Sequence, residues 1–261
     1  MKHCPTLAVL VTLSITTLNN SASAASIYAI NTGLSNDIAV VDAISQLNFL
    51  GNTVTTGSTL ADYSAYDQVW DLRYNQNLGP TDVTAMGNYL ASGGRMFLSG
   101  EQPAYTELRN ASLVDWVEAV GGGSMTLVNV RITGDQPVTT AGQIVAQPNQ
   151  RTFLRYYAAN SVSTPGTGFM VTETQSGLGH SSLIGWDFGD IIGSPNARML
   201  VGFDINLFRN SSAWAENMVH YLGGDAPPPV VPEPSTYAMA ALGLLGLGLL
   251  AWRRKHANRS R

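Results

Sequence analysis

The sequence contains a single cysteine, Cys4, among its 261 residues. This residue lies in an N-terminal segment that we expect to be removed. The mature chain would then have no disulfide, no thiolate nucleophile and no cysteine metal ligand. Charged residues make up only 12% of the chain, against about a quarter in typical soluble domains. With 44% hydrophobic residues, the composition excludes a disordered chain, which needs low hydrophobicity and high net charge.

Lysine is absent between residues 25 and 232, where eight arginines stand against 17 acidic residues. This part of the chain therefore has a net charge of about −9. Nucleic-acid binding requires clustered basic residues that displace counterions from phosphates. We therefore expect no nucleic-acid partner.

Residues 1–24 have the organisation of a signal peptide. Lys2 provides a basic start, an apolar stretch covers residues 7–18, and small residues follow at Ala22 and Ala24. The apolar stretch is too short to serve as a membrane anchor. We predict that signal peptidase cleaves after Ala24 and that the remaining chain is exported. The alternative is that this segment forms a buried N-terminal strand.

The C-terminal end combines a proline-rich linker, residues 225–236, with sixteen uncharged residues, 237–252. Proline favours extended backbone without internal hydrogen bonds, so the linker is predicted to be an exposed tether. As a helix, the uncharged stretch would measure roughly 24 Å, slightly less than a ~30 Å hydrocarbon core. Its apolar character on every face favours a transmembrane helix over a core helix of a globular domain.

Three basic residues follow the apolar stretch and indicate a stop-transfer signal that keeps the tail 253–261 in the cytoplasm: Arg253, Arg254 and Lys255. With Pro232-Glu233-Pro234 before the stretch, this end resembles the PEP-CTERM sorting signal. That signal is found in exported proteins of Gram-negative bacteria that make extracellular polysaccharide. The resemblance implies cleavage by an exosortase near the Pro-Glu-Pro motif. It further implies an inner-membrane-anchored precursor, a final place in the envelope, at the outer surface or in a biofilm matrix, and exopolysaccharide as a further partner.

The body, residues 25–224, alternates short apolar runs with amphipathic stretches in its first half. We expect strands at 26–33, 66–74 and 95–101 and helices at 35–51, 79–94 and 109–123. This alternation predicts a parallel sheet covered on both faces. Runs at 125–133, 152–160 and 168–174 predict an antiparallel extension, and further strands and a last helix, 211–224, complete the body. The prediction is a single three-layer α/β domain.

Helix starts and inner faces follow from the same patterns. The first helix is predicted to begin at Ser35 or Asn36, and the second at Thr81. Ser112 and Asp115 indicate a capping box for the third. The apolar positions predicted to face the core in the first helix are Ile38, Val41, Ile44 and Leu47.

The order of elements and the segment "YDQVWDLRY…MGNYLASGGRMFLSGE" resemble flavodoxin-like and class I glutamine-amidotransferase-like domains. The second family uses a cysteine on a strained turn together with a histidine. The mature chain has no cysteine, which excludes that thiol chemistry. Folds of this kind host many activities, so the resemblance implies architecture and not function.

Ligands of open parallel sheets bind at the carboxyl ends of the strands. The candidate pocket residues on this basis are Asp71, Arg73, Ser99, Glu101, His180 and Asp204. A Ser99–His180–Glu101 triad is one alternative, but a nucleophile elbow has glycine on both sides of the serine. Here only Gly100 is present.

No zinc-binding spacing of histidines occurs, and no cofactor or metal is expected. Four oxygen-bearing side chains offer calcium ligands but match no loop template: Asp187, Asp190, Asp204 and Asn206. We expect a non-catalytic structural or ligand-binding body. One alternative is a hydrolase or carbohydrate-active enzyme that uses Glu101 with Asp71 or Asp204, and another is a calcium- or sugar-binding module.

Overall fold

The computed structural model describes residues 24–174, 178–209 and 211–224. They belong to one compact unit that ends at Gly224. Four predicted features lie outside the described residues: the signal peptide up to residue 23, the linker 225–236, the membrane helix 237–252 and the basic tail 253–261. Within the described ranges, no helix has the length and apolar character needed to cross a membrane.

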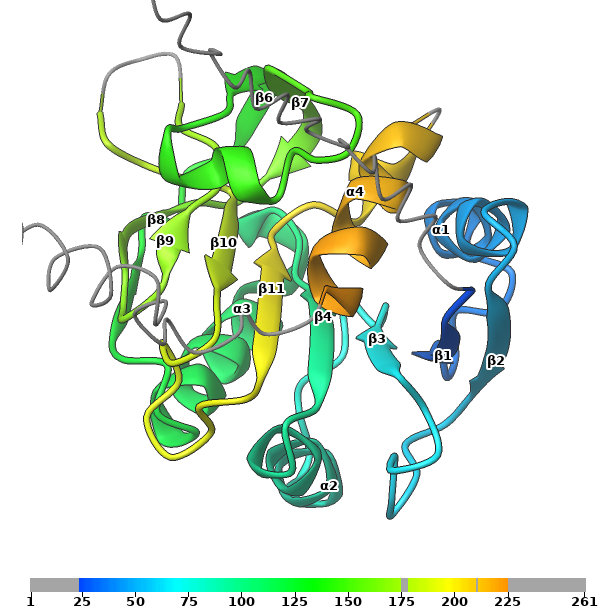
Figure 1. Ribbon diagram of the computed structural model, residues 1–261. Coiled ribbons are helices and arrows are strands. Elements are labelled where there is room, and N and C mark those ends of the chain that lie inside the picture. Colours follow the sequence, from blue (N-terminus) through cyan, green and yellow to red (C-terminus); the bar gives the residue numbers. More distant parts are fainter. Residues whose placement is uncertain (1–23, 175–177, 210, 225–261) are drawn as a thin grey trace, which may run out of the picture. The chain divides into compact units, whose positions relative to one another are not determined.

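The unit is built on a seven-stranded sheet with the order β2-β1-β3-β4-β11-β10-β9 (Figure 1). Its first five strands are parallel. β10 runs antiparallel to β11, and β9 pairs antiparallel with β10, so only β10 runs against the others. The strands are β1 (Ser26–Ile30), β2 (Thr53–Gly57), β3 (Gln68–Asp71), β4 (Arg95–Ser99), β9 (Phe169–Met170), β10 (Leu183–Trp186) and β11 (Arg198–Gly202). The predicted α/β class and mainly parallel sheet are confirmed.

Helices cover both faces of this sheet. On one face lie α1 (Ile38–Phe49) and α4 (Ser212–Gly223), and on the other lie α2 (Pro80–Ala91) and α3 (Pro103–Ala119). Side chains alternate along β1, so Ile27 and Ala29 join the core beneath α1 and α4, whereas Tyr28 and Ile30 join the core beneath α2 and α3. Four of the five parallel strands, β1, β3, β4 and β11, are thus buried on two sides, as their largely apolar sequences require. The edge strand β2 is mostly exposed.

The segment between α3 and β10 forms two small antiparallel sheets. One pairs β5 (Met125–Leu127) with β8 (Val162–Pro165), and the other pairs β6 (Ile132–Pro137) with β7 (Phe153–Ala159). Two short 3₁₀ helices complete the described fold, η1 (Ala141–Ile144) and η2 (Ile205–Phe208). The antiparallel extension predicted for this segment is present.

The predicted inner face of the first helix was only partly right, since Leu47 is buried and Ile44 packs against the core but Ile38 and Val41 are exposed. Asp37, rather than Ser35 or Asn36, caps α1, since its carboxylate accepts hydrogen bonds from the N–H groups of Ala39 and Val40. Two predicted core positions are exposed, Ile38 by 63% and Val41 by 40%. The buried face consists of Ala39, Val40, Ala43 and Leu47. Small alanines allow α1 to approach the sheet closely, and they carry little hydrophobic signal in the sequence.

The predicted starts of the other two helices were also wrong. Gly79 precedes α2, Pro80 occupies its first position, and the Asp82 carboxylate accepts a 2.8 Å hydrogen bond from the Gly79 N–H. Likewise α3 begins at Pro103, so Ser112 lies inside the helix and donates to the Arg109 carbonyl. Proline favours the first helical turn because its missing N–H has no partner there. Prolines 80 and 103 were the stronger signals.

Candidate functional site

The carboxyl ends of the parallel strands form the candidate site. In the sheet register Ile30 of β1 pairs with Asp71 of β3, and Ser99 of β4 pairs with Gly202 of β11. Residues that follow these strands therefore share one edge. Five of the six predicted pocket residues lie at this edge: Asp71, Arg73, Ser99, Glu101 and Asp204.

Asp71 is the centre of a buried ion-pair cluster. Its carboxylate receives two hydrogen bonds of 2.8 Å from the Arg73 guanidinium, in the bidentate geometry that arginine favours. Arg109 Nη2 lies 3.1 Å from Asp71 Oδ2, and Arg73 Nη2 lies 3.0 Å from Asp82 Oδ1. Burial opposes the charged carboxylate, but Arg109 and Arg73 outweigh it and hold the pKa of Asp71 below its usual value. Two carboxylates and two guanidiniums thus neutralise one another.

Ser99 belongs to the same cluster through its hydroxyl and its carbonyl. Its side chain is fully buried, and its hydroxyl donates a 2.9 Å hydrogen bond to the Asp71 carbonyl. Its own carbonyl accepts a 3.0 Å hydrogen bond from Arg109 Nε. No hydrogen bond joins Ser99 or Glu101 to His180 in the described part of the chain.

His180 was wrongly grouped with the strand-end residues. It lines a different cavity of about 410 Å³, together with residues 130–136 of the β6 region. The geometry of a Ser99–His180–Glu101 triad is therefore not present. The reason is that His180 precedes β10, an antiparallel strand, whereas the strand-end argument applies to parallel strands.

Glu101 forms a second, chemically different group with Asp204. Glu101 Oε1 accepts from the Gln102 N–H at 3.0 Å, and Oε2 accepts from the Ile205 N–H at 3.3 Å. Burial, and to a smaller degree the neighbouring Asp204 carboxylate, raise the pKa of Glu101 to about 8. Burial also raises the pKa of Asp204, although its carboxylate accepts hydrogen bonds from three backbone N–H groups. The Glu101 carboxyl is therefore mostly protonated at neutral pH.

Asn110 of α3 holds the loop that carries Glu101. Its Oδ1 accepts from the Glu101 N–H at 3.1 Å, and its Nδ2 donates to the Glu101 carbonyl at 2.6 Å. Asn110 and the neighbouring Arg109 are both buried, and neither is among the site residues predicted from the sequence. The start of α3 had been placed near Ser112, which left both residues at the solvent-exposed start of a helix.

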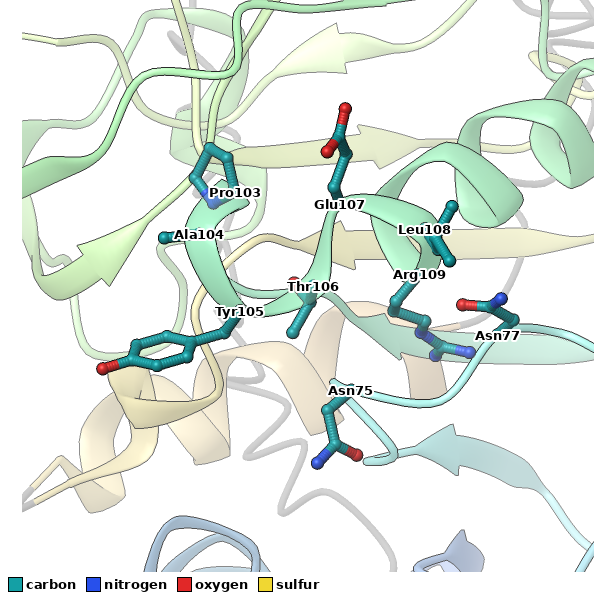
Figure 2. Close-up of a pocket in the computed structure, with 9 residues that line it drawn as sticks. All are labelled: Asn75, Asn77, Pro103, Ala104, Tyr105, Thr106, Glu107, Leu108 and Arg109. Atoms are coloured by element: carbon teal, nitrogen blue, oxygen red, sulfur yellow. The ribbon is translucent and has the colours of Figure 1, made fainter.

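A cavity of about 480 Å³ lies beside these clusters. Figure 2 shows Asn75 and Asn77 of the loop after β3 opposite the first turns of α3. Thr106 departs from helical geometry there, with φ −147° and ψ 37°. Of the residues in the two buried clusters only Arg109 lines this cavity. The charged residues predicted from the sequence as pocket residues therefore do not line this cavity.

The proposed calcium ligands do not converge. Asp187 pairs with Arg198 at 2.7 Å, and Asp190 accepts a hydrogen bond from the Asp187 N–H. Asp204 and Asn206 lie with Glu101 at the strand ends. Among the residues that the structure describes, no group of three His, Cys, Asp or Glu side chains is placed to hold a metal ion.

Comparison with known proteins gives a family match for the tail and only a similarity in fold for the body. Residues 230–255 match the PEP-CTERM protein-sorting motif. This chain carries a PEP-CTERM signal. The match confirms the resemblance of the Pro-Glu-Pro segment, the apolar stretch and the basic residues, and it supports export and processing by an exosortase. A comparison of the whole sequence with curated proteins gives no match.

The body is similar in fold to several solved structures. The mmIFT52 N-terminal domain superposes with a TM-score of 0.57 at 11% identity, over 78% of this chain and 99% of that one. A ThuA-like protein from Parabacteroides merdae gives 0.51 at 9% identity, over 79% and 94%. A β-galactosidase from Rahnella sp. R3 gives 0.50 at 11% identity, over 75% of this chain but 31% of that one. At such identities these likenesses show the fold alone.

Proposed function

We propose that this chain is an exported cell-envelope or surface protein of a Gram-negative, exopolysaccharide-producing bacterium. Signal peptidase would release the N-terminus after Ala24, and the apolar stretch 237–252 would hold the precursor in the inner membrane. An exosortase would then cut near Pro232-Glu233-Pro234 and pass the body to the envelope or the matrix. The observation that carries this proposal is the sorting motif at residues 230–255.

The physical chemistry of the tail agrees with such processing. A proline-rich segment remains extended and keeps its backbone accessible to an enzyme. An apolar helix behind it would set the height of that segment above the membrane, and the basic residues after it favour the cytoplasmic side. The proposed cleavage site would thus be presented at the outer membrane–water boundary.

The intact mass of the protein isolated from its own bacterium tests this proposal. We expect termini near residue 25 and near the Pro-Glu-Pro motif. A triple alanine variant of Pro232, Glu233 and Pro234 should retain the full C-terminus. The matched control replaces prolines 227–229 by alanine in the same linker and should be processed normally. A wild-type protein of full-length mass would reject the sorting proposal.

For the body we propose a non-catalytic structural or ligand-binding role. Support comes from how the strand-end groups are used. The guanidiniums of Arg73 and Arg109 are paired with carboxylates, and the Ser99 hydroxyl is bonded to a backbone carbonyl. An active site instead needs polar groups that face a space where substrate binds.

One observation favours an alternative, a hydrolase or carbohydrate-active enzyme that uses Glu101. The pKa of this carboxyl is raised to about 8, which would keep a general acid protonated at neutral pH. Only 3% of the Glu101 side chain is exposed, however. Incubation with a panel of polysaccharides and aryl glycosides tests it. Turnover that Glu101→Gln abolishes and the exposed control Glu107→Gln retains would replace the non-catalytic proposal.

A further inference from the structure

Three arginines surround a second hollow in this acidic domain. Of the eight arginines between residues 25 and 232, three are buried, Arg73, Arg109 and Arg198. Three of the remaining five line one cavity of about 150 Å³ between β7 and the start of α4. These are Arg151, Arg155 and Arg209, and we call this cavity the arginine pocket.

Strand β7 builds one wall of the pocket through its alternation. Leu154 and Tyr156 point into the core, whereas Phe153, Arg155 and Tyr157 face outward. The residues Phe153 and Tyr157 are exposed by 45% and 39%. The pocket therefore combines cations with the faces of two aromatic rings.

Two of the three guanidiniums, those of Arg151 and Arg209, lie over these rings. The Arg209 guanidinium carbon lies 5.7 Å from the centre of the Tyr157 ring, and that of Arg151 lies 5.9 Å from the centre of the Phe153 ring. Stacking places each guanidinium beside a flat apolar surface and leaves its N–H groups available.

Two acidic side chains approach the pocket, and both contacts are weak. Arg155 pairs with Asp135 at 3.1 Å, but their side chains are 65% and 35% exposed. Arg209 lies 4.0 Å from Asp42, at the limit of an ion pair. Exposed pairs of this kind contribute little and are readily replaced by a ligand. In the described ranges, no ion pair joins Arg151 to an acidic side chain.

From this arrangement we propose that the arginine pocket binds an acidic saccharide through a carboxylate-bearing sugar ring. A guanidinium forms two parallel hydrogen bonds to a carboxylate. The C–H face of the sugar would pack on Tyr157 or Phe153. A volume of about 150 Å³ is below that of drug-sized pockets, which measure roughly 300–1,000 Å³, so it suits one ring of a longer chain.

Other polyanions fit these observations less well. Nucleic-acid binding depends on a basic patch that neutralises several phosphates, and three guanidiniums on a body of net charge about −9 are too few. An acidic peptide offers carboxylates but no flat C–H face for the exposed rings. The saccharide uses both features of the pocket.

Isothermal titration of the full-length protein in mild detergent tests the proposal, with hexagalacturonate as the probe. Saturable binding is expected, with none to the neutral maltohexaose. Exchanging Arg155→Gln and Arg209→Gln together should weaken binding at least ~10-fold, because charge-assisted hydrogen bonds are lost. Arg131→Gln, an exposed arginine outside the pocket, is the matched control and should change affinity less than about twofold.

A second pair of variants tests the aromatic face. Tyr157→Ala should weaken hexagalacturonate binding several-fold, while Tyr105→Ala, which removes a ring that is 75% exposed elsewhere, should leave it unchanged. Equal affinity for hexaglutamate, equal weakening by Arg131→Gln, or no binding at millimolar probe would each overturn the proposal.

This inference rests on the ligand-binding role proposed for the body and is independent of the sorting proposal. A processed tail without saccharide binding would reject the acidic-saccharide site alone. Saccharide binding by a protein that its own bacterium leaves uncleaved would reject the sorting proposal alone.

Discussion

Two buried acids at the same edge of the sheet are held in opposite states of protonation. Asp71 follows β3 and is surrounded by the guanidiniums of Arg73 and Arg109, so its pKa lies below the usual value. Glu101 follows β4 and has Asp204 as its charged neighbour, so its pKa is raised to about 8. Both side chains are at most 3% exposed.

The comparison shows that burial alone does not decide the charge of a carboxyl group. Burial disfavours the ionised form in both places. At Asp71 two cations more than offset that cost. At Glu101 two backbone N–H groups offset it only in part, and the Asp204 carboxylate adds to it. The Asp71 cluster therefore stabilises the fold when its carboxylates are ionised. The group formed by Glu101 and Asp204 is most stable when it is protonated.

The largest effect is expected when the ion-pair cluster loses its central acid. Asp71→Asn would leave the guanidiniums of Arg73 and Arg109 buried with only Asp82 as an anionic partner. Removing one member of a buried pair costs about 3–5 kcal/mol. Urea unfolding at pH 7 should show a loss in this range. A loss under 1 kcal/mol would mean that the cluster adds no stability through its charges.

A second prediction uses the pH dependence of stability. Because Glu101 has a pKa near 8 when folded and near 4.5 when unfolded, the native state binds more protons between these values. Its contribution to stability is therefore fully present below pH 4.5 and is lost as pH rises to 8, by on the order of 4 kcal/mol. Urea unfolding from pH 5 to 9 should show this decline in the wild type.

The matched variant for this prediction is Glu101→Gln, which preserves shape and cannot ionise. Its stability should decline much less over the same pH range. The contribution of Asp71 to stability depends on pH in the opposite direction. Because the pKa of Asp71 is lowered, this contribution is present at neutral pH and is lost in acid. If the unfolding free energy of Glu101→Gln declined with pH as steeply as that of the wild type, another group would cause the pH dependence. The contrast drawn between Asp71 and Glu101 would then be wrong.

A smaller effect is expected at the residue that links the two clusters in sequence. Asn110→Ala would remove both hydrogen bonds to the Glu101 backbone and leave a buried N–H and carbonyl without them. This should cost about 2 kcal/mol. Thermal and urea unfolding of Asn110→Ala and of the exposed control Asn75→Ala would measure it. Equal stability of the two variants would contradict the role given to Asn110.

The smallest effect is expected at an exposed ion pair. Asp135→Asn removes the acidic partner of Arg155, and both side chains are substantially accessible to solvent. The expected change in unfolding free energy is about 0–1 kcal/mol, and it should shrink further in 1 M salt. A loss comparable to that of Asp71→Asn would show that burial is not what distinguishes the two pairs.

Much of the fold was predictable because its signals are local. Alternating strands and helices indicate a parallel sheet, and its strand ends must then share one edge. That reasoning placed Asp71, Ser99, Glu101 and Asp204 together. It failed for His180, which precedes an antiparallel strand, and for part of the inner face of α1, where Ala39 and Ala43 are buried in place of Ile38.

The contacts within the site were not predictable in this way. Arg109 meets Asp71 across 38 residues of chain, after β4 and the first turns of α3 have reversed its direction. Nothing near Arg109 in sequence marks it as buried. The grouping of Arg151, Arg155 and Arg209 likewise depends on β7 lying beside the loop before α4.

By itself, the sequence determined the α/β class and the C-terminal sorting motif, since both depend on the order and composition of adjacent residues. Only the tertiary structure decided which carboxylates are charged and which arginines face solvent together. Those properties depend on distances between side chains that folding alone brings together, in a medium where Coulomb interactions are stronger than in water.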